Sequence, residues 1–277
     1  MSLGLVVKVP EGLVLAAESR VTVTVADKQT GMPRGQAAYD NTTKLFSFKR
    51  LQDFIGVVTY GQAFIGKRTA YGYFTEFNDR LSERPAKERM SVYDFAKELS
   101  DFFKAKWDSE PPSVLPAGMI QEPMSFLVAG YNAEETSGRI YLVVIPDNPK
   151  PVEQSADTFG ITYGGDIGII YRLINGYDGS LQETIWQNMT KEQIEGLQLP
   201  FAYDALPLQD AVDLAILIIR TTINVQKLAI MPRSCGGPID VCTITSVGGL
   251  SYVQRKKITG EKHGAEGLIM GNYSLPD

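Results

Sequence analysis

The chain has 277 residues, with 27 Lys and Arg against 32 Asp and Glu, and a formal net charge of −5. This mild acidity argues against nucleic acid as the main partner, because phosphate binding needs a basic face. Hydrophobic residues make up 44 % and charged residues 21 % of the chain, which is typical of a globular protein that buries its core without disulfide or metal staples.

Strand patterns dominate the first part of the chain. Val21–Val25 alternates valine with threonine, the period-two pattern of a strand with one exposed face. Pro10 to Gly12 forms a turn signal between two apolar runs, and the polar stretch 27–41 predicts a loop or a long hairpin arm. The expected strands are Leu3–Val9, Leu13–Ala17, Val21–Val25, Lys44–Phe48 and Phe54–Tyr60.

Two helices are expected next, over Gln62–Leu81 and Ser91–Trp107. Ser91, with Asp94 three residues later, resembles a capping box in which Asp replaces the usual Glu. The two segments carry more aromatic rings than one core-facing stripe needs, so we expect part of this aromatic surface to form a subunit interface. The alternative is that all the rings pack inward. The rings are Phe64, Tyr71, Tyr73, Phe74, Phe77, Phe102 and Phe103.

The remaining elements are grouped by type, and strands and helices do not alternate as in a parallel βαβ fold. This grouping predicts an α+β fold, a four-layer αββα sandwich of two antiparallel sheets packed face to face with helices outside. We expect a single domain over residues 1–277, with 256–277 as a C-terminal tail. The later elements are a proline-rich loop over Glu110–Pro123, strands over Met124–Ala129, Arg139–Ile145 and Thr158–Tyr163, helices over Asp166–Ile174 and from Pro207, and strands over Ile239–Thr245 and Leu250–Arg255.

The chain offers few residues for metal or disulfide chemistry. Cys235 and Cys242 are too few for a disulfide framework and are expected to be reduced and buried. His263 is the one histidine, which leaves nothing for a histidine triad or a His-rich zinc site. We expect no cofactor and no metal. No apolar run approaches the about 20 residues of a membrane span, and the N-terminus lacks a signal-peptide pattern, so we expect a cytoplasmic protein with no membrane partner.

Without histidine, a nucleophile needs another base, and a chain's own α-amino group can serve. Its ordinary pKa of about 7.7–8.0 leaves a neutral fraction at cellular pH. Removal of Met1, which a small second residue favours, would give Ser2 a hydroxyl and an amine on the same residue. Serine is common at this position, so Ser2 alone is weak evidence of function.

Four strings in order resemble proteasome β-type subunits, which are N-terminal-nucleophile hydrolases. Counting back from the first string without a gap places Ser2 at the position of the family's N-terminal nucleophile. The resemblance covers about Ser2 to Arg255. The strings are Ala16-Ala17-Glu18-Ser19-Arg20, Lys44-Leu45-Phe46, Gly56-Val57-Val58-Thr59-Tyr60-Gly61-Gln62-Ala63 and Cys235-Gly236-Gly237-Pro238-Ile239-Asp240-Val241.

This resemblance implies a role for each matched residue. Ser2 attacks a peptide carbonyl, Lys44 favours the deprotonated hydroxyl, and Glu18 is the carboxylate that pairs with Lys44. The Gly61 amide donates to the developing oxyanion. Three residues are implied in substrate binding: Thr22 binds an extended peptide as an added strand, and Val21 and Thr59 line the pocket for the residue before the cut. Without the resemblance, Lys44 reaches solvent, Glu18 forms a surface pair with Arg20, and Gly61 is only a corner.

The chain departs from the family at several supporting positions. The nucleophile is Ser where the family usually has Thr, which predicts slower cleavage. Gly164, Pro232 and Cys235 stand where the family has a Ser, an Asp and a second Ser that hold the N-terminal amine. Ser234 or Arg233 are the candidates to substitute in part.

The sequence therefore predicts a proteasome β-like endopeptidase that acts on peptides or unfolded proteins through an acyl-enzyme on Ser2. The expected assembly is a homo-oligomeric ring, with an ATPase as a candidate partner. Two alternatives remain open. One is an inactive structural ring subunit, suggested by Gly164 and Pro232, and the other is a small-molecule amidase on the same fold.

Overall fold

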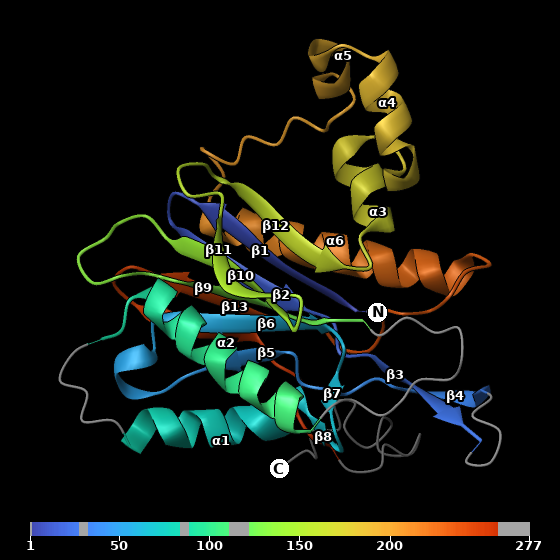
Figure 1. Cartoon of the computed structure of the whole chain (residues 1–277). Helices are drawn as coiled ribbons and strands as arrows, with labels where there is room; N and C mark the ends of the chain where they lie inside the picture. The colour runs from blue at the N-terminus through green and yellow to red at the C-terminus, as the bar shows by residue number, and fades with distance from the viewer. Residues whose placement is uncertain (1, 28–32, 84–88, 111–121, 260–277) are drawn as a thin grey trace, which may run out of the picture.

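The computed structural model describes residues 2–27, 33–83, 89–110 and 122–259. Two five-stranded antiparallel sheets form its centre (Figure 1). The first sheet has the order β12-β1-β2-β13-β14, formed by Gly160–Gly165, Leu3–Val9, Gly12–Ala17, Asp240–Thr245 and Gly249–Gln254. The second sheet has the order β11-β10-β9-β6-β5, formed by Asn148–Gln154, Arg139–Ile145, Met124–Gly130, Ile55–Gly61 and Leu45–Ser47.

Two short hairpins and several helices complete the described chain. The hairpins are β3 (Val21–Ala26) with β4 (Pro33–Tyr39) and β7 (Phe64–Ile65) with β8 (Arg68–Thr69). The helices are α1 (Ala70–Glu83), α2 (Val92–Ser109), α3 (Gly168–Ile170) with a π-helical turn over Tyr171–Asn175, α4 (Gln182–Asn188), α5 (Lys191–Glu195) and α6 (Leu208–Leu228), with 3-10 turns at Arg50–Gln52 and Gly179–Leu181. The grouping into antiparallel sheets and helices confirms an α+β fold.

Three apolar clusters show which elements pack together. One joins α1 and α2 to the second sheet and includes Phe77, Phe103 and Phe126. Another joins α6 to the first sheet through side chains such as Ile218. The third contains residues of both sheets, among them Leu15 and Val58. Ser2 comes directly before β1, so this packing brings the start of the first sheet close to the second sheet.

The structure corrects the expected helix over Gln62–Leu81. Residues 64–69 form the β7–β8 hairpin, and α1 begins at Ala70, whose amide donates to the Ala63 carbonyl at 3.0 Å. The second helix begins as expected, because the Ser91 side chain accepts a hydrogen bond from the Asp94 amide at 3.0 Å. Ser91 therefore satisfies one of the orphan amides of the first turn.

Some elements have no counterpart in the sequence predictions. Strand β11 contains Pro149 and Pro151, which argue against a strand except at a sheet edge, and β11 is an edge strand. Helices α4 and α5 were also missed. Of the expected C-terminal tail, 260–277 lies outside the described residues, and Lys256 is anchored to Asp240 through its main-chain amide at 2.8 Å. Within the described ranges, no helix is long and apolar enough to cross a membrane.

The predicted exposure of the aromatic surface on the two helices is wrong for most of the rings. Five of the seven are buried, and only Tyr71 is more than half exposed, at 52 %. Phe77 packs edge-on against Phe95, with ring centroids 5.6 Å apart. The buried rings are Tyr73, Phe74, Phe77, Phe102 and Phe103. These rings therefore supply core packing, and the alternative of inward packing describes them.

Replacing one buried and one exposed ring on α1 tests this arrangement. We expect Phe77→Ala to lower the free energy of unfolding by about 3–5 kcal/mol, because it leaves a cavity in the core. Tyr71→Ala should change it by less than about 1 kcal/mol. Urea denaturation of the two variants measures the difference, and equal losses would contradict the assignment of the core face of α1.

Candidate active site

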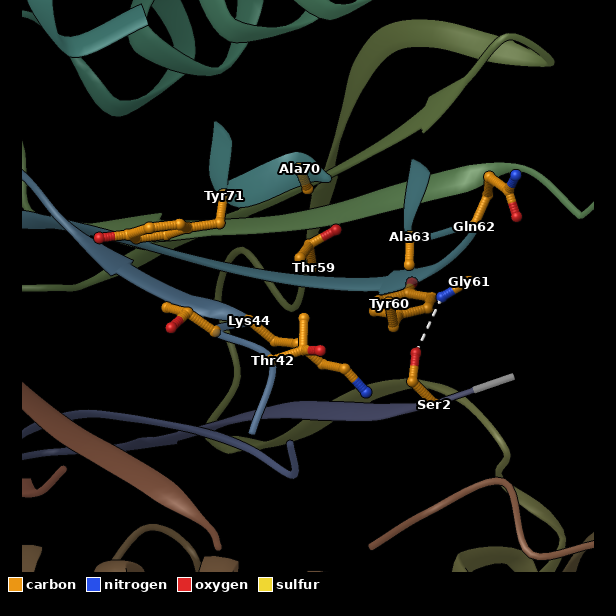
Figure 2. A pocket seen from close by; sticks show the side chains of 11 residues that line it. Ser2, Thr42, Lys44, Thr59, Tyr60, Gly61, Gln62, Ala63, Ala70 and Tyr71 are labelled. Carbon is orange, nitrogen blue, oxygen red and sulfur yellow. Dashed lines mark hydrogen bonds between the residues drawn. The ribbon is translucent and has the colours of Figure 1, made fainter. Parts of the chain in front are cut away.

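Ser2 lies where the ends of the two sheets meet. It precedes β1, and only 3 % of its surface is exposed. Its Oγ accepts a hydrogen bond of 3.1 Å from the main-chain amide of Gly61, the last residue of β6 (Figure 2). The two residues that the sequence assigned to nucleophile and oxyanion donor are thus in direct contact.

The backbone at Gly61 requires glycine. Its φ is +81°, and a Cβ at this position would lie 2.2 Å from the carbonyl oxygen of Pro123. The next amide, of Gln62, donates to that same carbonyl at 3.0 Å, which fixes the corner. The Gly61 amide is therefore directed at Ser2, in position to donate to an oxyanion formed beside the Ser2 hydroxyl.

Lys44 and Glu18 form a buried ion pair beside this contact. Lys44 Nζ donates to Glu18 Oε1 and to the carbonyl of Arg20, and the two side chains are 5 % and 0 % exposed. Figure 2 shows Lys44 extended along the cavity with its Nζ toward Ser2. Lys44 does not reach solvent, and the simple readings of Lys44 and Glu18 as surface residues do not hold.

The Glu18 carboxylate receives hydrogen bonds from three main-chain amides as well. Leu3 N donates to Oε1 at 3.3 Å, while Arg20 N and Gly236 N donate to Oε2 at 2.6 and 3.0 Å. Arg20 itself turns outward and pairs with Asp40 at 2.6 Å. A buried carboxylate with this many donors is compensated for its lost hydration.

A small, partly open pocket lies between Ser2 and the start of α1. Thr59 lies in it, with its hydroxyl donating to the Ser125 carbonyl at 3.1 Å. Apart from Lys44, the side chains around it are uncharged, which suits a small apolar or hydroxylated substrate group. It is lined by Ser2, Thr42, Thr43, Lys44, Thr59, Tyr60, Gly61, Gln62, Ala63, Ala70 and Tyr71 (Figure 2).

The other two expected substrate-binding residues lie outside this lining. Val21 is 7 % exposed and is not among the lining residues, so the structure does not bring it into the pocket. Thr22 is exposed on β3, which pairs with β4 on one edge. No other described strand pairs with β3. This leaves an edge at which an extended chain could add as a strand.

Gly164, Pro232 and Cys235, the three residues that differ from the family pattern, lie in different surroundings. At Gly164, a Cβ would lie 2.1 Å from Tyr60 Cζ and 2.3 Å from its hydroxyl, so the Tyr60 ring occupies the space of a serine side chain. Burial raises the pKa of Tyr60 to about 12, which keeps its hydroxyl protonated. Pro232 is exposed, whereas Cys235 is buried.

Sequence reasoning missed several residues around Ser2. Thr42, Thr43, Ala70 and Tyr71 line the cavity but belong to no matched string. Their signal was only their closeness in sequence to Lys44 and to the start of α1. Asp166, Gln226 and Ser234 form a polar group that is joined to the Ser2 carbonyl through the main-chain amide of Asp166. Of these three, only Ser234 had been considered.

Comparisons with known proteins extend over most of the chain. No family model matches it, and no curated protein matches it. Solved structures do match: Anbu (ancestral β-subunit) from Yersinia bercovieri, with a TM-score of 0.55 at 15 % identity over 96 % of this chain and 94 % of that one. The helical assembly of the Anbu complex from Pseudomonas aeruginosa matches with a TM-score of 0.52 and 18 % sequence identity, over 92 % of this chain and 88 % of that one. An Anbu (Gly-1) mutant from Hyphomicrobium sp. strain MC1 matches with a TM-score of 0.52 and 14 % sequence identity, over 91 % of this chain and 87 % of that one.

At these identities the comparison shows a shared fold. It also corrects the family named from the sequence strings. The prediction of a proteasome β-type subunit is wrong, because these three solved structures that share the fold are Anbu proteins, a distinct family with a related, proteasome-like fold. The four strings lie at the end of β2, at the start of β5, along β6 and at the approach to β13.

The buried pair can be tested through stability. We expect Glu18→Gln to lower the free energy of unfolding by about 3–5 kcal/mol, because Lys44 is left as an uncompensated buried charge. The double variant Glu18→Gln/Lys44→Met should recover part of this loss, since no buried ammonium remains. Asp101→Asn breaks an exposed helix pair with Lys97 and serves as the control, with little expected change. Equal stability of Glu18→Gln and the parent in urea would contradict a buried pair.

The thiols give a prediction about reactivity. Burial is the main cause that raises the pKa of Cys235 to about 12, with Glu18 adding to the effect, and burial raises the pKa of Cys242 further. At pH 8 both groups are therefore protonated and unreactive. Treatment with a disulfide reagent should label neither cysteine in the native protein and both in denaturant. Rapid labelling of Cys235 in the native protein would show that it is exposed.

Proposed function

We propose that this chain, in a form that begins at Ser2, hydrolyses peptide bonds through an acyl-enzyme on the Ser2 hydroxyl. The observation that carries the proposal is the 3.1 Å contact between Ser2 Oγ and the Gly61 amide, beside the buried Lys44–Glu18 pair. A nucleophile, a cation that favours its deprotonated form and an oxyanion donor thus meet at one point. The base is the α-amine that breakage of the bond before Ser2 would create.

Each residue has a task in this mechanism. The Ser2 hydroxyl attacks the peptide carbonyl and passes its proton to the α-amine, directly or through water. Lys44, held by Glu18, stabilises the charge that develops on the hydroxyl oxygen. Gly61 N donates to the carbonyl oxygen as it becomes an oxyanion, an effect of roughly 3–4 kcal/mol for one donor. The carbon–nitrogen bond then breaks, and the amine product leaves with the proton that the α-amine had taken up. Water hydrolyses the remaining ester, which releases the acid product and restores Ser2.

Substrate binding follows from the cavity and from β3. The residue before the cut enters the cavity with Thr59 in its wall, which favours a small or medium apolar side chain. The substrate main chain runs beside Thr22 as an added strand. Both assignments belong to the proposal and depend on an extended peptide substrate.

We further propose that the described residues form one domain in four layers, α on β on β on α, with Ser2 at the open end of the two sheets. The chain also acts as a homo-oligomer in this proposal. The Anbu of Pseudomonas aeruginosa forms a helical assembly, and apolar side chains here are exposed beyond the sheets. Among these are Trp186 at 61 %, Leu217 at 53 % and Leu228 at 85 %.

Covalent modification tests the proposed activity. Protein that begins at Ser2 is treated with a peptide epoxyketone carrying a small apolar residue next to the electrophile. Because ring formation needs both the hydroxyl and the free amine, we expect the intact mass to rise by one inhibitor. Ser2→Ala should show no adduct, and Lys44→Ala should react at least about a hundredfold more slowly, in line with the loss of a group that stabilises developing charge.

The same experiment separates the alternatives. A folded protein beginning at Ser2 that forms no adduct would support an inactive structural subunit and contradict the proposal. Adduct formation with faster turnover of small acyl amides than of peptides would favour a small-molecule amidase. Tyr93→Ala is a matched control that should react with the epoxyketone at the parent rate. Tyr93 lies on α2 and is 37 % exposed.

A further inference from the structure

A helical arm, residues 176–199, stands out from the body of the chain between α3 and α6 and contains α4 and α5 (Figure 1). Its two ends are joined at the base, where the Leu199 amide donates to the Ile174 carbonyl at 3.0 Å. Gly176 turns the chain there with a φ of +77°, and a Cβ on it would lie 2.1 Å from the Leu197 carbonyl oxygen. Beyond this base, α4 packs mainly on α5 and on the 3-10 turn before it.

The arm exposes apolar side chains. Trp186 is 61 % exposed, and Leu181, Leu197 and Leu199 are exposed as well. Aromatic side chains of this size are enriched in the cores of protein interfaces. An open hollow lies beside the ring, lined by Gly179, Ser180, Gln182, Glu183, Trp186 and Gln187. The arm therefore presents both a projecting ring and a recess.

The arm is also acidic. Asp178 pairs with Arg172, and Glu195 pairs with Lys191 at 3.5 Å. Among the described residues, Glu183 and Glu192 pair with no lysine or arginine. Their charges are therefore left for a partner. The charged residues between 176 and 199 are Asp178, Glu183, Lys191, Glu192 and Glu195.

The C-terminal half of α6 has the opposite charge. The sequence between Asp213 and Asp240 contains no acidic residue, but it contains Arg220, Lys227 and Arg233. Arg220 and Lys227 are exposed, and neither pairs with an acid within the described ranges. Arg233 donates to the Lys227 carbonyl at 3.1 Å, which keeps this third positive charge at the end of the helix.

Apolar side chains lie among these positive charges. Leu217 and Leu228 are 53 % and 85 % exposed, and Ile230, just after the helix, is fully exposed. Positions 217, 220, 224 and 228 recur at three or four residues, so they share one face of the helix. The opposite face of α6 packs on β1, β2 and β13. The exposed face is therefore a second apolar surface, with positive charge.

The two surfaces complement each other but do not meet within one chain. The side chains of both are exposed, so neither surface covers the other. Opposite charge together with apolar groups on both sides is the pattern of a specific contact. A two-fold axis between two copies brings the arm of each onto α6 of the other, which covers both surfaces on both copies. One arrangement thus satisfies both surfaces without a different protein.

We infer that the arm, residues 176–199, docks on the exposed face of the C-terminal half of α6 in a second copy of this chain. Trp186 contacts Leu228 of the partner subunit, while Glu183 and Glu192 lie against the positive charges of the partner's helix. The inference rests on the homo-oligomer of the proposed function and gives it an interface. It does not depend on Ser2 acting as a nucleophile.

Charge reversal tests this interface. The arm variant is Glu183→Lys/Glu192→Lys, and the helix variant is Arg220→Glu/Lys227→Glu. We expect the parent to associate at micromolar concentration in sedimentation velocity. Each variant alone should raise the dissociation constant at least about tenfold, because like charges then face each other. Glu183→Gln/Glu192→Gln, which only removes charge, should weaken association less.

A control on α2 separates this effect from a change in net charge. Asp101→Lys/Asp108→Lys alters the net charge as much as the arm variant does, at two exposed positions. We expect this control to associate as the parent does. Circular dichroism of each variant alone checks that it has folded.

An equimolar mixture of the arm variant and the helix variant provides the decisive comparison. In such a pair a positive arm faces a negative helix and a negative arm faces a positive helix, so association should return to the parent level. An oligomer that neither variant weakens, or folded variants that do not associate on mixing, would overturn this interface and leave the homo-oligomer itself standing. A monomeric parent would overturn both and point to a different protein as the partner. Epoxyketone labelling of the same samples tests the hydrolase separately.

Discussion

The buried carboxylate of Glu18 is the constraint on which the site depends. It draws together segments far apart in sequence: the start of β1 through Leu3, the end of β2, the residue before β5 through Lys44, and the approach to β13 through Gly236. Since a buried carboxylate must be satisfied on both oxygens, all these segments have to be in place together. The site is complete only when the first sheet has closed around Glu18.

The second sheet supplies the part that faces the nucleophile. Gly61 ends β6, and its positive φ aims its amide at Ser2. The preceding residue, Tyr60, fills the space that a side chain at position 164 would need. Gly164 on the first sheet has no side chain at the point where the large ring of Tyr60 projects from the second sheet, so the two residues pack together between the sheets.

Local patterns in the sequence were sufficient to place most strands and the start of α2. The alternation in Val21–Val25 and the capping residue Ser91 depend on short-range chemistry, which a sequence displays directly. The sheet order and β11 were not accessible, because Pro149 and Pro151 argue against a strand unless the edge position is known. Gln62–Thr69 was assigned to a helix because its apolar residues continue the spacing of α1, whereas tertiary contacts turn it into a hairpin.

For the site, the sequence indicated the right neighbourhood through residues whose chemistry is unusual where they stand. A lysine beside an apolar strand, a glutamate after Ala16-Ala17 and a glycine at a strand end are visible as letters. The structure brings Ser2, Glu18, Lys44 and Gly61 together. Asp166 and Gln226 carry no such signal, since a polar residue after a glycine pair or near a helix end is usually a solvated one. Only the strand pairing shows that Asp166 faces Ser2.

The prolines of β11 also have a consequence for how copies of this chain can meet. An edge strand normally presents a row of amides and carbonyls to which another strand can add. Pro149 and Pro151 have no amide hydrogen, so this border of the second sheet lacks two donors where a neighbour would seek them. Growth of the sheet from one copy to the next is disfavoured along that border. A copy that approaches this border would therefore make contact through side chains and would not extend the hydrogen-bonded sheet.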